Sequence, residues 1–130
     1  MTARAERVVA RARALVGVRF RPQGRSRISG LDCIGLVAAA IDAGDAPRDY
    51  ALRGGSAARL ATALAAAGLR PVVAAGAGDV LVLAPGPAQL HLGIFTGEGL
   101  VHGDAGLRHV VERPGPIPWP ILSIWRVEED

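Results

Sequence analysis

The stretch Gly30-Leu31-Asp32-Cys33-Ile34-Gly35-Leu36-Val37 contains the only cysteine of this 130-residue chain. Asp32 belongs to a residue type that caps helix N-termini, and the apolar residues after it predict a helix from Ile34 to Ala43, closed by Gly44. Cys33 would then lie in the first turn, where unpaired backbone N–H groups and the helix dipole favour a thiolate and lower a thiol pKa. A backbone N–H at this place would also help to stabilise an oxyanion.

The same stretch also fits a structural cysteine. Cys33 begins a helical stripe that continues through Leu36, Val37, Ala40 and Ile41, and such a stripe faces a core. Judged alone, Cys33 is better interpreted as a packed core residue. A single cysteine excludes an intrachain disulfide, a Cys-rich zinc site and an iron–sulfur site.

Two of the three histidines make the catalytic interpretation stronger. His91 begins the strand-like run His91-Leu92-Gly93-Ile94-Phe95, and His102 ends the next short run after a Gly97-Glu98-Gly99 turn. Two antiparallel strands joined in this way bring His91 and His102 side by side. One imidazole would act as general base to the thiol and the other would orient it. His109 lies outside this pattern and is interpreted as a surface or structural residue.

A zinc site is the competing use of these histidines. It would need His91, His102 and a remote carboxylate such as Asp104. The chain has no His-x-x-x-His or His-Glu-x-x-His spacing, so this interpretation is less favoured.

The order of elements predicts one α+β domain that covers residues 1–130. An amphipathic helix over residues 3–16 comes first, then an ordered loop over 18–30, and a helix from its cap Ser56 to about Ala67 is closed by Gly68. After Pro71 the chain has short strand-like runs, which are Val80–Leu83, Leu90–Thr96, Leu100–His102, Leu107–Glu112 and Ile121–Val127. We expect N-terminal helices packed on a C-terminal antiparallel sheet of about five strands. The substrate subsites are expected in the loops over 18–30 and 43–55.

The charge pattern is informative but open to two interpretations. The net charge is +3, all cations are arginines, and eight of them fall within the first 27 residues. This clustering fits either an anionic partner or a solvated helix face, and the second is favoured. The first 20 residues lack the apolar core of a secretory signal, and no stretch approaches the length of a membrane span. We therefore expect synthesis in the cytoplasm without a signal peptide.

Four blocks of the sequence together resemble the NlpC/P60 cysteine peptidases. The stretch from Gly30 to Val37 resembles the Asp-Cys-Ser-Gly-Leu-Val block around the nucleophile of that family. Gly78-Asp79-Val80-Leu81-Val82-Leu83 resembles its Gly-Asp-Leu-Val strand, and His91-Leu92-Gly93-Ile94-Phe95 its His-Val-Gly-Ile-Tyr block. Leu100-Val101-His102 resembles its Phe-Ile-His block. The blocks occur in the family's order and cover nearly the whole chain.

The resemblance implies a papain-like α+β fold and hydrolysis of an amide in the peptide stem of peptidoglycan, commonly between D-γ-glutamyl and diaminopimelyl residues. By the resemblance, Cys33 is the nucleophile, His91 the base, and His102 the polar residue that orients His91. It implies no cofactor. We also expect no metal site and no nucleic-acid partner. Arg25 and Arg27 are weak candidates for binding a carboxylate of the stem.

The chain also departs from the family pattern near the nucleophile. Ile34 replaces the usual serine, and Phe20 stands where many members have a tyrosine near the oxyanion, so two hydroxyl groups are missing beside the capping Asp32. The segment Pro22-Gln23-Gly24-Arg25, running on to Gly30-Leu31-Asp32-Cys33-Ile34-Gly35, resembles the branch found in phage and gene-transfer-agent tail modules. This resemblance implies a virion component acting in the periplasm of a target cell. Two alternatives remain open, a catalytically weak structural component of a tail tip and a thiol amidase or acyltransferase on another substrate.

Overall fold

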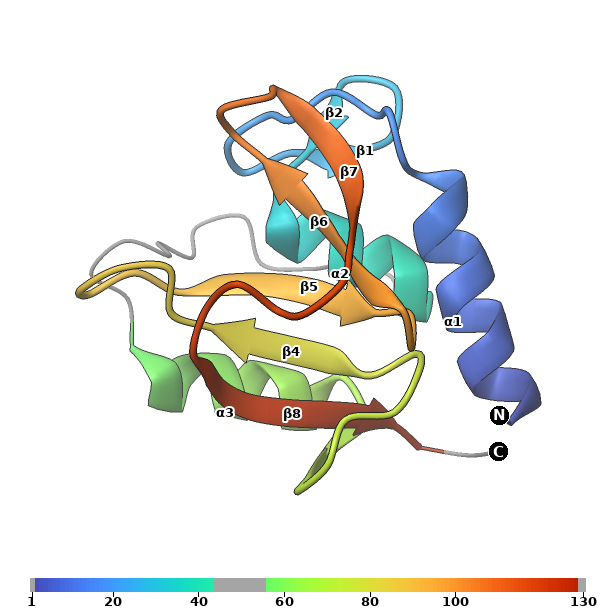
Figure 1. Cartoon of the computed structure of the whole chain (residues 1–130), viewed down its shortest axis with the longest axis vertical. Coiled ribbons are helices and arrows are strands. Elements are labelled where there is room, and N and C mark those ends of the chain that lie inside the picture. The colour runs from blue at the N-terminus through green and yellow to red at the C-terminus, as the bar shows by residue number, and fades with distance from the viewer. Residues whose placement is uncertain (1, 44–55, 129–130) are drawn as a thin grey trace.

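A computed structural model describes residues 2–43 and 56–128 of the chain. In this part of the chain, the helices are α1 (Ala3–Ala14), α2 (Cys33–Ile41) and α3 (Ala57–Ala66). The strands are β1 (Arg25–Ser26), β2 (Gly30–Leu31), β3 (Leu69–Val72), β4 (Val80–Leu83), β5 (His91–Phe95), β6 (Gly99–Asp104), β7 (His109–Pro114) and β8 (Ile121–Val127). Figure 1 shows α2 and α3 behind the main sheet and α1 along its side.

The helix starts follow from local capping signals in the sequence. The Asp32 carboxylate accepts the backbone N–H of Gly35, and the Ser56 hydroxyl accepts that of Arg59, so both predicted caps are confirmed. The second helix ends at Ile41, earlier than predicted, because Asp42 takes a left-handed conformation with φ of 58°. The predicted stop at Gly44 lies outside the described residues.

The main sheet is antiparallel and has six strands in the order β3-β8-β4-β5-β6-β7. The α+β class with helices before strands is therefore confirmed, but the sheet has one strand more than the five expected. The additional strand is β3, which pairs only with β8 at one edge. It contains Pro71, and proline is tolerated in edge strands because it has no N–H to donate.

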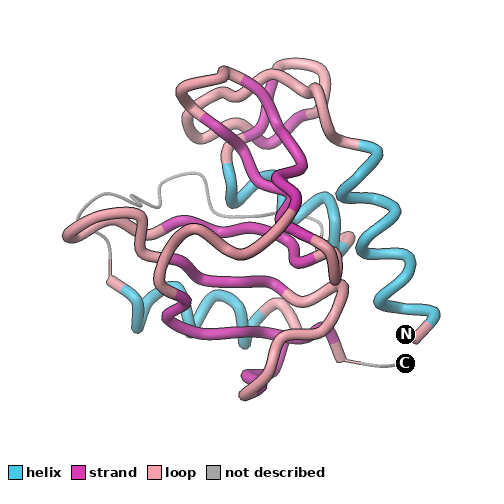
Figure 2. Tube along the Cα trace, viewed as in Figure 1, coloured by secondary structure: helices cyan, strands magenta, loops and turns pink. Residues whose placement is uncertain are grey.

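The segment 18–30 also contains short strands where an ordered loop was expected. Arg25 pairs with Leu31 and Ser26 with Gly30, which makes the small β1–β2 sheet. Before this hairpin, Arg19 forms a bridge to His109 and Phe20 forms one to Leu31. Figure 2 shows this segment beside the far end of the β6–β7 hairpin. The loop is therefore anchored both to the sheet and to the chain that leads into α2.

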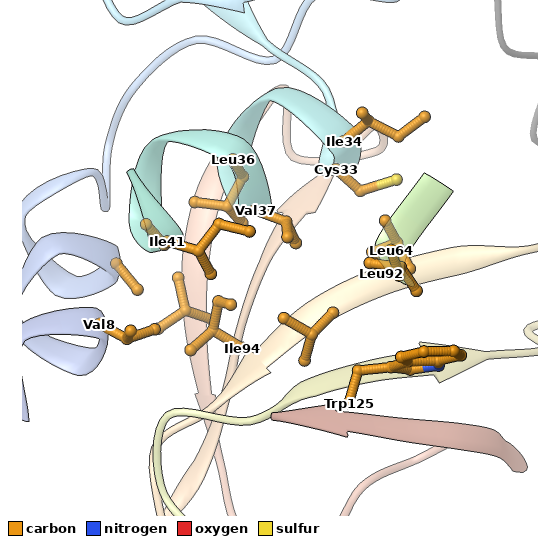
Figure 3. Close-up of a cluster of buried hydrophobic side chains, with 14 of the residues drawn as sticks. Val8, Cys33, Ile34, Leu36, Val37, Ile41, Leu64, Leu92, Ile94 and Trp125 are labelled. Carbon is orange, nitrogen blue, oxygen red and sulfur yellow. The ribbon is translucent and has the colours of Figure 1, made fainter. Parts of the chain in front are cut away.

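The sheet separates two apolar clusters. The larger one lies between the helices and one sheet face, and Figure 3 shows Val37 and Ile41 of α2 above Ile94 of β5. Strand β4 contributes to both clusters in alternation, because Val80 and Val82 belong to the larger one and Leu81 and Leu83 to the smaller one. None of the helices in the described ranges is long and apolar enough to cross a bilayer.

Candidate active site

Cys33 is the first residue of α2 and its side chain is 2% exposed. The sulfur points from α2 towards β5, where Leu92 packs in the same cluster (Figure 3). The backbone N–H of Leu92 donates a hydrogen bond to the thiol and lowers its pKa, although burial and the Asp32 charge raise that pKa more. Because Leu92 follows His91 directly, the main chain of His91 runs beside the sulfur. The fold thus places Cys33 against the backbone of β5 next to His91.

The acidity of Cys33 differs from the expectation based on the helix N-terminus. Burial, and next the negative charge of Asp32, raise the pKa of the Cys33 thiol from 9.0 to about 12. Hydrogen bonds from the Leu92 and Cys33 N–H groups and the charge of Arg25 lower this pKa by less. The expected lowering of the pKa was therefore wrong for this enclosed thiol. The local effect of the helix start is present, but desolvation of the thiolate outweighs it.

His91 and His102 form a hydrogen-bonded pair on neighbouring strands. Nε2 of His91 lies 3.0 Å from Nδ1 of His102, and the ring planes are perpendicular. The two residues share one face because β5 and β6 pair in a register that sets Ile94 opposite Val101. This bond uses Nε2 of His91, so Nδ1 is the other ring nitrogen at which His91 could accept a proton. Within the described residues, no hydrogen bond joins Cys33 to either ring.

Both histidines are held in the neutral form near neutral pH. Burial, and next the neighbouring His102, lower the pKa of His91 from 6.5 to about 4, while the charge of Asp104 opposes this shift. Burial also lowers the pKa of His102, again against the charge of Asp104. A neutral imidazole is the form that accepts a proton, so the pair has the protonation state that a general base needs.

A tryptophan covers the histidine pair. Trp119 lies in the connection between β7 and β8, and its ring centroid is 5.4 Å from that of His91 and 5.3 Å from that of His102. Both contacts are edge-to-face. Sequence reasoning missed this residue. Its signal was the rarity of tryptophan, of which the chain has two, and its position between Pro118 and Pro120.

Comparison with solved structures identifies the fold. NlpC1 from Trichomonas vaginalis is 19% identical with a TM-score of 0.67, over 94% of this chain and 44% of that chain. The peptidoglycan hydrolase RipB from Mycobacterium tuberculosis is 23% identical with a TM-score of 0.62, over 98% of this chain and 66% of that chain. RipD from the same organism, described as a non-catalytic NlpC/p60 domain protein adapted to peptidoglycan binding, is 19% identical with a TM-score of 0.62, over 98% of this chain and all of that chain. The chain has the NlpC/P60 fold.

This chain spans less than half of NlpC1 and about two thirds of RipB. No protein-family model and no curated protein matches it.

Within this NlpC/P60 fold, Phe20 lies beside the start of α2. Its ring is 3.3 Å from the place where a β carbon on Gly103 would stand, and that place is 3.8 Å from the carbonyl carbon of Asp32. Ile34 is 8% exposed and belongs to the larger apolar cluster. Both positions therefore lie near Cys33 and present only carbon there.

The two arginines proposed for substrate binding have different surroundings. The Arg25 side chain is 7% exposed, and its Nη1 lies 2.6 Å from Oδ1 of Asp32 and 2.8 Å from the Gly24 carbonyl oxygen. Arg27 is exposed in the turn between β1 and β2. Of the two, Arg27 is the one whose guanidinium faces solvent where a carboxylate can approach.

His91 and His102 lie together, but Asp104, the third residue considered for a metal, does not complete a set of ligands with them. In residues 2–43 and 56–128, no group of three His, Cys, Asp or Glu side chains is arranged to hold a metal ion. Asp104 is used at the turn after β6, where it accepts the N–H of Leu107. His109 pairs with Asp104 in the β6–β7 register, and its ring bonds the Leu107 carbonyl.

Proposed function

We propose that this chain is an NlpC/P60 cysteine peptidase that hydrolyses an amide in the stem peptides of peptidoglycan, of the D-γ-glutamyl-diaminopimelate type. The observation that carries the proposal is the position of Cys33. It starts a helix against the backbone of β5 beside His91, whose Nε2 is bonded to His102. The similarity of fold to RipB, a peptidoglycan hydrolase, supports the substrate class.

The proposed reaction begins from a neutral thiol and a neutral imidazole. As the sulfur attacks the scissile carbonyl carbon, Nδ1 of His91 takes the thiol proton, and Nε2–H of His91 donates to Nδ1 of His102 throughout. The oxyanion of the tetrahedral intermediate lies beside the N–H of Cys33 at the start of α2. The imidazolium then gives its Nδ1 proton to the leaving amine, which leaves a thioester on Cys33. Water, deprotonated by His91, hydrolyses the thioester and releases the γ-glutamyl carboxylate and the thiol.

The neutral resting pair determines how the proton moves. With a thiol pKa of about 12 and a His91 pKa of about 4, the thiolate–imidazolium pair is a rare state of the unbound protein. Proton transfer therefore accompanies the attack on substrate rather than preceding it. The cost of forming charge is reduced in the bound state by Asp104, which favours the imidazolium form of both histidines.

We also propose a substrate contact and a biological setting for this peptidase. Arg27 meets a carboxylate of the stem peptide from the β1–β2 turn. The enzyme is carried at the tip of a phage-like tail and opens the wall of a target cell. The support for this setting is the resemblance of Pro22-Gln23-Gly24-Arg25 to the peptidases of tail modules.

The test is cleavage of a defined stem tripeptide, L-alanyl-γ-D-glutamyl-diaminopimelate, followed by mass spectrometry. Wild type is expected to release diaminopimelate, while Cys33→Ala and His91→Ala are expected to be inactive with unchanged circular dichroism. Arg27→Gln is expected to raise KM with little effect on kcat. Cleavage by a folded Cys33→Ala variant would contradict the proposal.

A second candidate function is a catalytically weak structural component of a tail tip. It is favoured by the raised pKa of the Cys33 thiol and by the apolar side chains at Phe20 and Ile34. RipD shows the same fold in a protein described as non-catalytic and adapted to peptidoglycan binding. This candidate predicts that wild type sediments with purified sacculi and leaves the tripeptide intact. Tripeptide cleavage at an enzymatic rate would exclude it.

A further inference from the structure

Asp32 has an ionic partner, Arg25, in addition to its role as helix cap. Its carboxylate accepts the N–H of Gly35 at 2.9 Å and the N–H of Gln23 at 3.0 Å, and Arg25 donates to it from 2.6 Å. The side chains of Asp32 and Arg25 are 8% and 7% exposed. The carboxylate is therefore a buried anion next to the cysteine, and the guanidinium is a buried cation next to the carboxylate.

The backbone of the loop before α2 positions Arg25 beside Asp32. A β carbon on Gly35 would collide with the carbonyl oxygen of Gly24, so the loop packs directly on the first turn of the helix. Gln23 has a φ of 58°, a left-handed conformation that is uncommon for a residue with a side chain. In this conformation its N–H reaches Asp32. The backbone thus adopts an unfavourable geometry in which Asp32 and Arg25 meet beside Cys33.

We propose that Arg25 is a positioning residue of the nucleophile, whose guanidinium holds the Asp32 carboxylate in place as the helix cap and cancels that carboxylate's charge beside Cys33. The proposal rests on the function proposed above only in taking Cys33 as the nucleophile.

The charges around the thiol explain why such a residue is needed. The Asp32 carboxylate accepts three hydrogen bonds, and its negative charge opposes formation of the thiolate. His91 on β5 is neutral, so it supplies no positive charge before the reaction. Arg25 on β1 is the cation that acts on the thiol, and its charge lowers the pKa of Cys33 while Asp32 raises it. Without Arg25 the helix cap would inhibit the nucleophile that it positions.

The experiment measures the alkylation rate of Cys33 by iodoacetamide at one fixed pH below the thiol pKa. At such a pH the rate follows the thiolate fraction, because the thiolate is the reacting form. Arg25→Gln is expected to slow alkylation roughly tenfold, the equivalent of about one pKa unit. Asp32→Asn is expected to accelerate it by a similar factor, since asparagine still caps the helix and the charge is lost. The double variant is expected to react at close to the wild-type rate.

The double variant separates charge from packing. If Arg25 only held the loop in place, each single variant would loosen the site, all three variants would react faster than wild type, and the double variant would be the fastest. That result overturns the proposal, and so does an unchanged rate in Arg25→Gln. Arg25→Lys is expected to keep the wild-type rate by retaining the charge. Arg21→Gln, which removes an exposed arginine from the same segment, is the matched control with no expected effect. Should Arg25→Gln not fold, acceleration in Asp32→Asn with a wild-type rate in Arg25→Lys still supports the proposal, and no acceleration overturns it.

These rates are measured without a wall substrate. If the wild-type protein does not cleave the stem tripeptide but the variants show the expected alkylation rates, the proposed function is wrong and the proposed role of Arg25 stands. If the wild-type protein cleaves the tripeptide but all variants are alkylated at equal rates, the proposed function stands and the proposed role of Arg25 is wrong.

Discussion

Nε2 of His91 and Nδ1 of His102 are 3.0 Å apart, so one of these two nitrogens donates a hydrogen bond to the other. If Nδ1 of His91 is to accept the thiol proton, the hydrogen of neutral His91 must be on Nε2. Nδ1 of His102 is then the acceptor, and the hydrogen of His102 is on its Nε2. His102 therefore orients His91 and stabilises its imidazolium form, without a need to exchange a proton itself.

This direction predicts that an acceptor, not a titratable ring, is required at position 102. His102→Asn keeps a carbonyl oxygen that can accept from His91, and we expect it to retain most of kcat. His102→Ala removes the acceptor, and we expect kcat to fall roughly a hundredfold because the base loses its orientation. The measurement is kcat on the stem tripeptide for both variants. Equal activity of wild type and His102→Ala would remove His102 from the mechanism.

Trp119 is expected to set the acid limit of activity. It packs on both imidazole rings, and burial is the main cause of the lowered pKa of His91. Trp119→Ala admits water to the pair, so the pKa of His91 is expected to rise from about 4 towards its ordinary value of 6.5. The acid limb of the kcat/KM profile then moves to higher pH. Trp119→Phe keeps a ring over the pair and is expected to leave the limb near its wild-type position.

The same lowered pKa predicts how stability depends on pH. Between about pH 4 and pH 6.5, His91 is protonated in the unfolded chain but neutral in the folded chain. Stability is therefore lost as the pH falls through this window, by up to about 3 kcal/mol for the full shift. Urea denaturation at a series of pH values measures the slope, and His91→Asn should show a smaller one. An identical slope in wild type and His91→Asn would mean that other groups cause the loss.

The sequence predicted those features that depend on neighbouring residues. The caps Asp32 and Ser56 form within one helical turn, and the register that brings His91 near His102 follows from one short turn between two strands. Strand β8 has the bounds predicted from its apolar run. These elements depend on residues close together in the sequence, so the sequence pattern is sufficient to predict them.

Features that depend on distant contacts were missed. Strand β3 is a short edge strand with a proline, and it is a strand only because β8 lies beside it. The contact of Arg25 with Asp32 requires the close approach of Gly24 to Gly35, which no local pattern shows. The acidity of Cys33 was predicted in the wrong direction for the same reason, because burial is a property of the whole fold.

Restoring the family's residue at position 20 and at position 34 is expected to have different effects on activity and stability. Phe20→Tyr adds a hydroxyl beside the start of α2 at a partly exposed site, and we expect it to raise kcat several-fold at unchanged stability. Ile34→Ser removes a side chain that is 8% exposed within the larger apolar cluster. We expect it to lower the free energy of unfolding by about 2–4 kcal/mol. Tripeptide kinetics and urea denaturation of both variants check this contrast, and a stable, more active Ile34→Ser would contradict it.

Away from the site, the ion pair of Asp79 and Arg126 is expected to be the one that matters for stability. Asp79 is 2% exposed, and Arg126 donates to both of its carboxylate oxygens, at 2.9 and 2.8 Å, from β8. Arg126→Met leaves a buried carboxylate with only the N–H of Gly76 as a partner. Because the guanidinium is 40% exposed, we expect a loss of about 2–3 kcal/mol, below the full cost of breaking a wholly buried pair.

The exposed pair of Arg70 and Glu128 provides the matched control for this prediction. Its atoms are 3.9 Å apart and its side chains are 51% and 60% exposed, so Glu128→Gln is expected to change the free energy of unfolding by less than about 0.5 kcal/mol. Urea denaturation of both variants under one condition gives the comparison. Equal losses in the two variants would show that burial of Asp79 does not determine the strength of its ion pair. A large loss confined to Arg126→Met would show that β8 is held to the start of β4 by charge as well as by its backbone pairing.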